Sequence, residues 1–171
     1  GLLQYNGSQW SIFPLNNKTI ARSLLIKDGK IFVGGQNEFG KFEVDSTGLL
    51  IYRSLLYLIP EKDRSFEDVW EIVENKGEIL FYASDRLFVY DGEGILSYSF
   101  NSEIKFLGKA NGQVFIQTSD QLHYFANAKL QLIPTKLGLA EMEITAALGL
   151  EGQKTVFSTL KNGMLVLQLS L

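Results

Sequence analysis

Residues 34–40, Gly-Gly-Gln-Asn-Glu-Phe-Gly, have the composition of a loop that could cradle a phosphate group. Such a loop needs a helix directly after its glycines, because the first turn of the helix supplies backbone amides that point at the anion. The segment that follows, Lys-Phe-Glu-Val at 41–44, predicts a strand instead. The full Gly-x-x-x-x-Gly-Lys-Ser/Thr pattern is also absent. We therefore interpret 35–40 as a lengthened turn between two strands.

Catalytic chemistry has little support in the sequence. The single histidine, His123, lies in an alternating Gln-Leu-His-Tyr-Phe segment and has no orienting partner nearby, so a packing or surface role is expected. The absence of cysteine excludes disulfides, thiol catalysis and Cys-ligated metals. The acidic pairs at 67–68, 71 and 74, and 141 and 143 lack the spacing of a calcium loop, although a glycosidase pair is not excluded. We expect no catalytic residue, no metal and no cofactor.

Composition places the chain among ordinary globular domains. It has 171 residues, of which 46% are hydrophobic, 20% charged and 12% aromatic, and the aromatic content favours strands. The net charge of −3 provides no electrostatic surface for nucleic acid. No apolar stretch approaches the ~18 residues that span a bilayer, so direct membrane insertion is not expected. No signal peptide opens the sequence either.

An internal repeat organises the chain. Four segments read as a short strand, a glycine turn and a second strand, and their glycines are Gly29, Gly77, Gly112 and Gly152. Third and fourth strands follow in at least three of these units, and Asn6-Gly7 and Asp91-Gly92 are hairpin signals of the type I′ kind. Four antiparallel strands in about 40 residues are typical of a β-propeller blade. A helical pattern over 61–77 competes weakly, and its second half is better read as an inner strand.

The predicted fold is therefore all-β, a β-propeller segment of about four four-stranded blades. The expected blade pieces are 1–17, 18–58, 66–100, 103–134 and 143–171. A closed four-bladed ring would need 9–15 as the outer strand of the last blade. We favour an excerpt of a larger propeller, seven-bladed or tandem, because an open arc would expose strand edges and apolar faces. Seven aromatic residues are predicted to pack between blades: Phe32, Phe81, Tyr82, Phe88, Tyr90, Phe115 and Tyr124.

A binding surface is predicted where second-to-third-strand turns and blade-to-blade connections meet on one face. The turn at 35–40 should lie beside the long connection 55–68, with inner-strand entries and the turn after Ser84 nearby. Polar groups mixed with aromatics suit sugar-like or peptide ligands, although plain solvated loops and a core tryptophan are the alternative. The candidate ligand-binding residues are Arg22, Gln36, Asn37, Glu38, Arg64, Glu67, Asp68, Trp70, Asp85 and Arg86.

The repeat resembles a known family. GLLQYNGSQW at 1–10 matches the hallmark of the two-component-regulator propeller repeats, and LFVYDG at 87–92 is a partial copy that lacks the tryptophan. Phe125-Ala126-Asn127 departs further from the Tyr-Asp-Gly of the hallmark. These repeats form the sensor regions of Bacteroidetes-type regulators that precede a "three-Y" domain and a histidine kinase or helix-turn-helix output. The resemblance implies an extracytoplasmic or periplasmic sensory module of an inner-membrane protein, often one that reads carbohydrate-related signals.

The sequence thus favours a non-enzymatic sensor propeller that binds a small ligand and relays it to an output domain. Expected partners are an oligosaccharide or other small ligand, the remaining blades and output domain of a parent chain, and a second copy in a homodimer. The alternatives are a protein-interaction scaffold and a propeller-type polysaccharide lyase or glycosidase.

Overall fold

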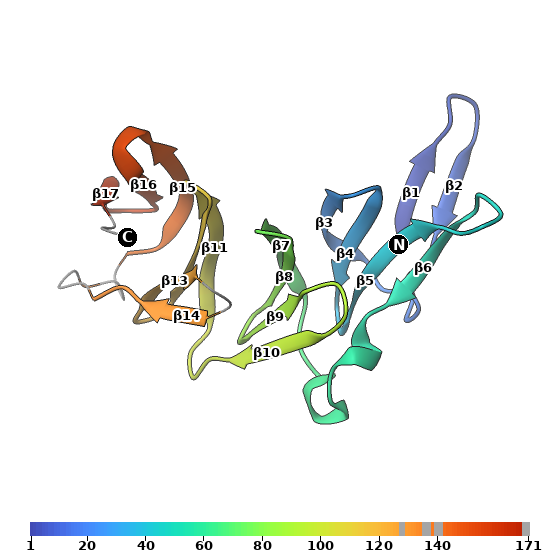
Figure 1. Cartoon of the computed structure of the whole chain (residues 1–171), viewed down its shortest axis with the longest axis horizontal. Coiled ribbons are helices and arrows are strands. Elements are labelled where there is room, and N and C mark those ends of the chain that lie inside the picture. Colours follow the sequence, from blue (N-terminus) through green and yellow to red (C-terminus); the bar gives the residue numbers. More distant parts are fainter. Residues whose placement is uncertain (127–128, 135–137, 139–141, 169–171) are drawn as a thin grey trace. The chain divides into compact units, whose positions relative to one another are not determined.

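The computed structural model describes residues 1–126, 129–134, 138 and 142–168. Its regular structure consists of antiparallel strands arranged in five separate sheets, with short 3₁₀ turns between some of them (Figure 1). The chain divides into two compact units, Gly1–Ser99 and Phe100–Leu171.

The first unit contains a hairpin and two four-stranded sheets. The hairpin is β1 (Leu2–Tyr5) and β2 (Trp10–Phe13). The first sheet is β3 (Ala21–Lys27), β4 (Lys30–Gly35), β5 (Glu38–Val44) and β6 (Leu50–Ser54). The 3₁₀ turns η1 (Leu56–Leu58) and η2 (Glu61–Asp63) connect it to β7 (Val69–Asn75), β8 (Glu78–Ala83), β9 (Arg86–Tyr90) and β10 (Ile95–Ser99). Both sheets pair their strands in sequence order, as a propeller blade does.

The second unit continues the pattern. Its first sheet is β11 (Ile104–Ala110), β12 (Gln113–Thr118), β13 (Leu122–Ala126) and β14 (Lys129–Leu132). Its second is β15 (Ile144–Leu150), β16 (Lys154–Thr159) and β17 (Met164–Gln168), with η4 (Glu151–Gln153) between the first two strands. Three strands of this sheet lie within the described residues, which end at 168.

The repeated glycines lie in the predicted turns, but the type I′ turns occur at other positions than the sequence suggested. Asp28-Gly29, Lys76-Gly77 and Asn111-Gly112 have positive φ at both residues, the backbone of a two-residue I′ hairpin. At the predicted I′ sites only Gly7 and Gly92 have positive φ. There the Asn6 and Asp91 side chains accept hydrogen bonds from the backbone amides two and three residues further along the chain. Each of these loops is four residues long, 6–9 and 91–94. The hairpins are predicted correctly and their turn type is wrong.

Segment 61–77 holds no long helix. Glu61–Asp63 is a single 3₁₀ turn, and Val69–Asn75 is the inner strand β7, as the alternation of the sequence indicates. β2 pairs with β1 in a two-stranded sheet, and within the described residues it joins no other sheet.

An aromatic core joins the two sheets of the first unit. Phe39 of β5 is fully buried, and its ring centroid lies 4.6 Å from that of Phe81 and 4.9 Å from that of Phe88, both in the next sheet. Close approach of the sheets depends on Gly34, where a Cβ would come within 2.4 Å of Val69 Cγ1. Of the aromatics predicted to pack between blades, Phe32, Phe81, Tyr82, Phe88 and Tyr90 are buried in this unit.

The second unit has an aromatic contact of its own between its two sheets. Phe115 of β12 packs edge-on against Phe157 of β16, with 5.0 Å between ring centroids, and both are buried. Tyr124 packs against this cluster while remaining partly exposed, so it is less enclosed than predicted.

Candidate functional site

The predicted site belongs entirely to the first unit, at the end of the sheets where β4 turns into β5. We call this the loop end. Gln36 forms an isolated antiparallel bridge with Asp68, and the Asn37 amide donates to the Glu67 carbonyl over 3.3 Å. The Asn37 side-chain oxygen accepts a hydrogen bond from the Phe66 amide at 2.7 Å. The connection 55–68 therefore lies beside the turn, as the sequence predicted.

The turn itself is shorter than predicted. Gly35 pairs directly with Glu38, so Gln36 and Asn37 alone connect the strands, and Asn37 adopts a φ of 50°. Residues expected in a lengthened loop at 38–40 belong to β5 instead. The reason is that a residue such as Asn tolerates the left-handed conformation, which allows a tight turn.

Glu38 is consequently buried rather than displayed at the surface. Its side chain is 3% exposed, and its Oε1 accepts hydrogen bonds from Tyr52 Oη at 3.1 Å and Ser54 Oγ at 2.7 Å. Burial raises the pKa of Glu38 above its usual value, while these two hydrogen bonds oppose the rise. Burial and the nearby carboxylate also raise the pKa of Tyr52. Glu38 thus ties β5 to β6 and is not placed to meet a ligand from solvent.

Arg22 and Trp70 form an exposed pair within the predicted set. Arg22 Nε donates to Asp68 Oδ1 at 3.1 Å, and its guanidinium carbon lies 5.6 Å from the centroid of the Trp70 ring. Trp70 is 50% exposed, so its reading as a core tryptophan is wrong. Asp68 orients the guanidinium over the ring, and the pair presents a flat aromatic face beside a cation.

A β-bulge explains why both side chains point outward. Arg22 is the extra residue between Ala21 and Ser23, which pair with consecutive residues of β4, and Trp70 is the extra residue at the equivalent place in β7. A bulge re-aims one side chain and is common beside functional sites. The inner strands of the second unit have the same irregularity, at Lys105 in β11 and Thr145 in β15.

The remaining predicted residues hold the connection against the sheets. Glu67 accepts a hydrogen bond from Ser84 Oγ at 2.6 Å. Arg86 Nη1 donates to the Asp63 carbonyl at 3.1 Å, and its Nε lies 3.8 Å from an oxygen of Asp85. Arg64 donates to the Ile59 carbonyl within its own connection and joins none of the other candidates.

The structure thus gathers Arg22, Gln36, Asp68 and Trp70 at one place, with Asn37 and Glu67 directly behind them. Sequence reasoning missed Tyr52, Ser54, Asp63 and Phe66, which partner the predicted residues. Their role depends on strand register and on how the connection folds back. The recurring bulge was also missed, although aligning the four inner strands of the repeat would have placed it.

Metal and acid–base chemistry have no visible arrangement in the described part of the chain. There, no three His, Asp or Glu side chains lie close enough together to hold a metal ion. His123 is half-buried, lies edge-on to Phe100, and has its pKa lowered by burial, with the charge of Asp120 opposing. A search of the described residues finds no helix with the length and apolarity to cross a membrane.

Comparisons with known proteins bear on the fold. The chain matches no family model, and no curated protein is significantly similar to it in sequence. Among solved structures, it is similar over 94% of its length to the extracellular domain assigned to the hybrid two-component system BT3049 of B. thetaiotaomicron, with 18% identity and a TM-score of 0.58. It covers 23% of that domain, so it spans about a quarter of the length of such a relative.

Two other similar structures come from other kinds of protein. The WD40 β-propeller domain of Doa1 matches 97% of this chain, with 10% identity, 57% of its own length covered and a TM-score of 0.64. A catalytically inactive virginiamycin B lyase from Staphylococcus aureus, determined with quinupristin, matches 93%, with 12% identity, 59% of its own length covered and a TM-score of 0.55. The chain therefore has the predicted β-propeller fold, and extracellular domains of two-component systems are among the proteins that share it. Because a lyase and a WD40 domain share it too, the fold alone does not select a function.

Proposed function

We propose that this chain is part of a non-enzymatic sensor propeller on the extracytoplasmic side of a membrane protein, and that it binds a small, carbohydrate-derived ligand. The observation that carries the proposal is the Arg22–Trp70 pair, which two equivalent bulges project from adjacent inner strands. The similarity in fold to extracellular domains of two-component systems supports the sensory context.

The chemistry of the pair suits a sugar. An exposed indole face offers an apolar surface for the C–H side of a pyranose ring, and a guanidinium beside it donates hydrogen bonds to hydroxyl groups. Asp68 holds Arg22 in place, which lowers the entropic cost of ordering it around a ligand. Gln36, exposed and bridged to Asp68, adds a further polar group at the same place. Signalling would then require the ligand to favour one arrangement of this end over another, which the parent chain passes to its output domain.

Unfolding midpoints of the full chain test the proposal directly. Neutral and acidic hexasaccharides (cello-, xylo-, manno- and galacturono-) would be screened, since a ligand at a hundredfold excess over its Kd raises the midpoint by roughly 5 °C. We expect at least one to do so, and Trp70→Ala to abolish the shift. Trp10→Ala is the matched control, because Trp10 is a similarly exposed tryptophan in the distant hairpin. A panel without effect, or equal loss in both variants, would overturn the carbohydrate proposal.

The scaffold alternative is favoured by a different observation. The β1–β2 hairpin exposes Leu3, Tyr5, Trp10 and Ile12, which form two cross-strand pairs on one face. Each of these side chains is more than half exposed, and the Tyr5 and Trp10 rings lie 4.8 Å apart. A contiguous apolar patch of this kind is typical of a surface that packs against another protein. Concentration-dependent association that Trp10→Ala weakens, with no hexasaccharide bound, would favour the scaffold.

A further inference from the structure

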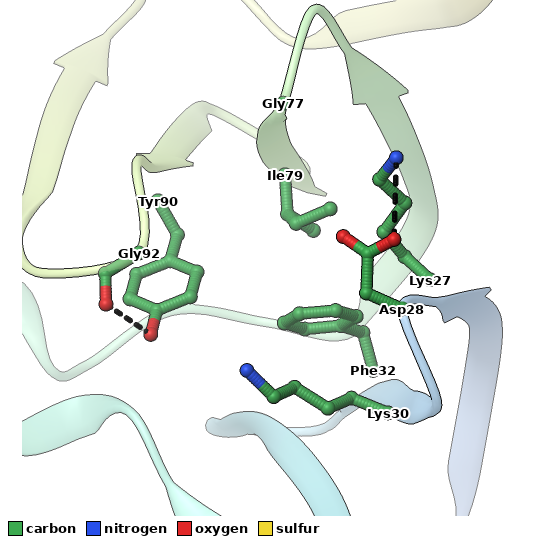
Figure 2. Close-up of a pocket in the computed structure, with 8 residues that line it drawn as sticks. All are labelled: Lys27, Asp28, Lys30, Phe32, Gly77, Ile79, Tyr90 and Gly92. Atoms are coloured by element: carbon green, nitrogen blue, oxygen red, sulfur yellow. Dashed lines mark hydrogen bonds and ion pairs between the residues drawn. The ribbon is translucent and has the colours of Figure 1, made fainter.

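A pocket lies at the opposite end of the same two sheets, where β3 turns into β4 and β9 into β10. We call this the turn end. Its cavity volume is about 120 Å³, close to the roughly 150 Å³ of an engineered apolar cavity that binds benzene. Figure 2 shows three apolar side chains around it, Phe32, Ile79 and Tyr90, with Lys27, Asp28 and Lys30 at its edge.

The apolar part of the pocket is rigidly held. Phe32, Ile79 and Tyr90 are each no more than 6% exposed, and the ring centroids of Phe32 and Tyr90 lie 6.2 Å apart. Tyr90 Oη donates to the Gly92 carbonyl at 2.7 Å, so the phenol is anchored and its ring presents carbon atoms to the pocket (Figure 2). These walls suit a ring-shaped apolar group.

The edge of the pocket carries positive charge that the fold does not neutralise. Lys27 and Lys30 stand directly opposite each other across the β3–β4 hairpin, an arrangement in which like charges repel. Asp28 offsets Lys27 weakly, since it is mostly exposed and its oxygen lies 3.7 Å from the ammonium nitrogen. Lys30 has no ion-pair partner among the residues that the structure describes, so an anion between these two lysines would relieve the repulsion.

The charged residues on β5 and at the start of β8 do not pair with Lys30. Lys41 pairs with Phe32 in the strand register, so it lies on the same face, and it shares the Glu43 carboxylate, 3.3 Å away, with Arg53. Glu78 follows the Gly77 turn but alternates to the face opposite Ile79. Lys30 thus differs from Lys27 and Lys41 in having no ion pair among the described residues.

From these observations we propose that the turn-end pocket binds a small carboxylate carried on an apolar ring. The ring lies against Phe32 and Tyr90, and the carboxylate is bound by the ammonium groups of Lys30 and Lys27. This site is separate from the loop end and does not depend on the proposed carbohydrate ligand.

Ligand-observed ¹⁹F NMR on the full chain tests this proposal, with 4-fluorobenzoate as the probe and the neutral 4-fluorobenzamide as its matched control. We expect the benzoate to bind and the benzamide to bind at least roughly tenfold more weakly, because a charge-assisted contact is lost. Lys30→Gln should weaken benzoate binding by a similar factor, and Lys30→Arg should retain most of it. Lys62→Gln, a change at an exposed lysine of η2, should have no effect.

The proposal is overturned if benzoate does not bind, if benzamide binds as well, or if Lys30→Gln and Lys62→Gln bind it equally. Trp70→Ala separates the two ends of the unit, since it should leave benzoate binding unchanged while abolishing any hexasaccharide effect. Loss of benzoate binding in that variant would also overturn the assignment to the turn end.

Discussion

The two ends of the sheets β3–β6 and β7–β10 both carry charged side chains, but these side chains are paired to different extents. At the loop end, charged and polar groups bind one another: Arg22 with Asp68, Glu67 with Ser84, and Glu38 with Ser54. At the turn end, Lys30 has no ion pair among the described residues and lies at the edge of a pocket lined by the buried rings of Phe32 and Tyr90. The polar residues that suggested a binding site in the sequence therefore serve largely to hold the connection 55–68 and strand β6 in place.

Truncation of Phe66 should have the largest effect of the changes considered. This side chain belongs to the connection 55–68, is 6% exposed, and packs against Phe39 and Phe88 with centroid distances of 5.6 and 5.1 Å. Phe66→Ala should lower the free energy of unfolding by about 3–5 kcal/mol, since it leaves a cavity. Urea unfolding measures this, and a loss below about 1 kcal/mol would mean that the connection does not seal the core.

Removal of the Asn37 side chain should have an intermediate effect. Asn37→Ala leaves the Phe66 amide without its acceptor and replaces a residue that tolerates positive φ with one that does not, with an expected cost of about 1–3 kcal/mol. Asn37→Asp keeps the acceptor and tolerates the same backbone, so it is the matched control. Equal unfolding free energies for the two variants would contradict the structural role of this side chain.

The repeat made most of the fold predictable. Glycines at 29, 77 and 112 need positive φ in tight turns, and alternation marks the strands between them, so local residue patterns locate the strands and turns. The connection beside the β4–β5 turn was predictable from blade topology as well. Sequence reasoning placed Glu38 inside a loop at 35–40, whereas β5 begins at Glu38, because the pairing of Gly35 with Glu38 depends on register rather than composition.

The rest of the site was not predictable from local patterns. Arg22 and Trp70 point outward because each lies in a β-bulge. A bulge is defined by the pairing of two strands, so the sequence of one strand does not reveal it. The turn-end pocket combines Phe32 of one sheet with Ile79 and Tyr90 of the next, so it arises from packing between sheets. Lys27 and Lys30 flank a glycine turn, and nothing in their local sequence indicates that they lie beside a pocket.

The buried carboxylate at the loop end should make stability depend on pH. Burial raises the pKa of Glu38 in the folded protein above its ordinary value of 4.5, so the folded state retains this proton to higher pH than the unfolded chain. Its contribution to stability therefore falls as pH rises from near 4.5 through the folded pKa.

Glu38→Gln removes this contribution while keeping a similar shape. Measured by urea unfolding at about pH 4 and about pH 7, the variant should gain stability relative to the wild type as pH rises. A difference between the two proteins that stays constant with pH would contradict the burial of a charged group here.

Neutralising Lys30 should have the smallest effect on stability. Lys30→Gln removes a repulsion and breaks no ion pair among the described residues, so its unfolding free energy should stay within about 0.5 kcal/mol of the wild type or rise slightly. The same urea series measures it, and a clear loss of stability would show that Lys30 has a structural role like the loop-end residues.

Backbone amide shift mapping of the full chain with 4-fluorobenzoate tests the contrast between the two ends most directly. We expect the amide resonances of residues 27–32, 77–79 and 90–92 to shift, and those of residues 36–38 and 66–70 to stay in place. Shifts centred on the loop end, or no shifts at either end, would contradict it.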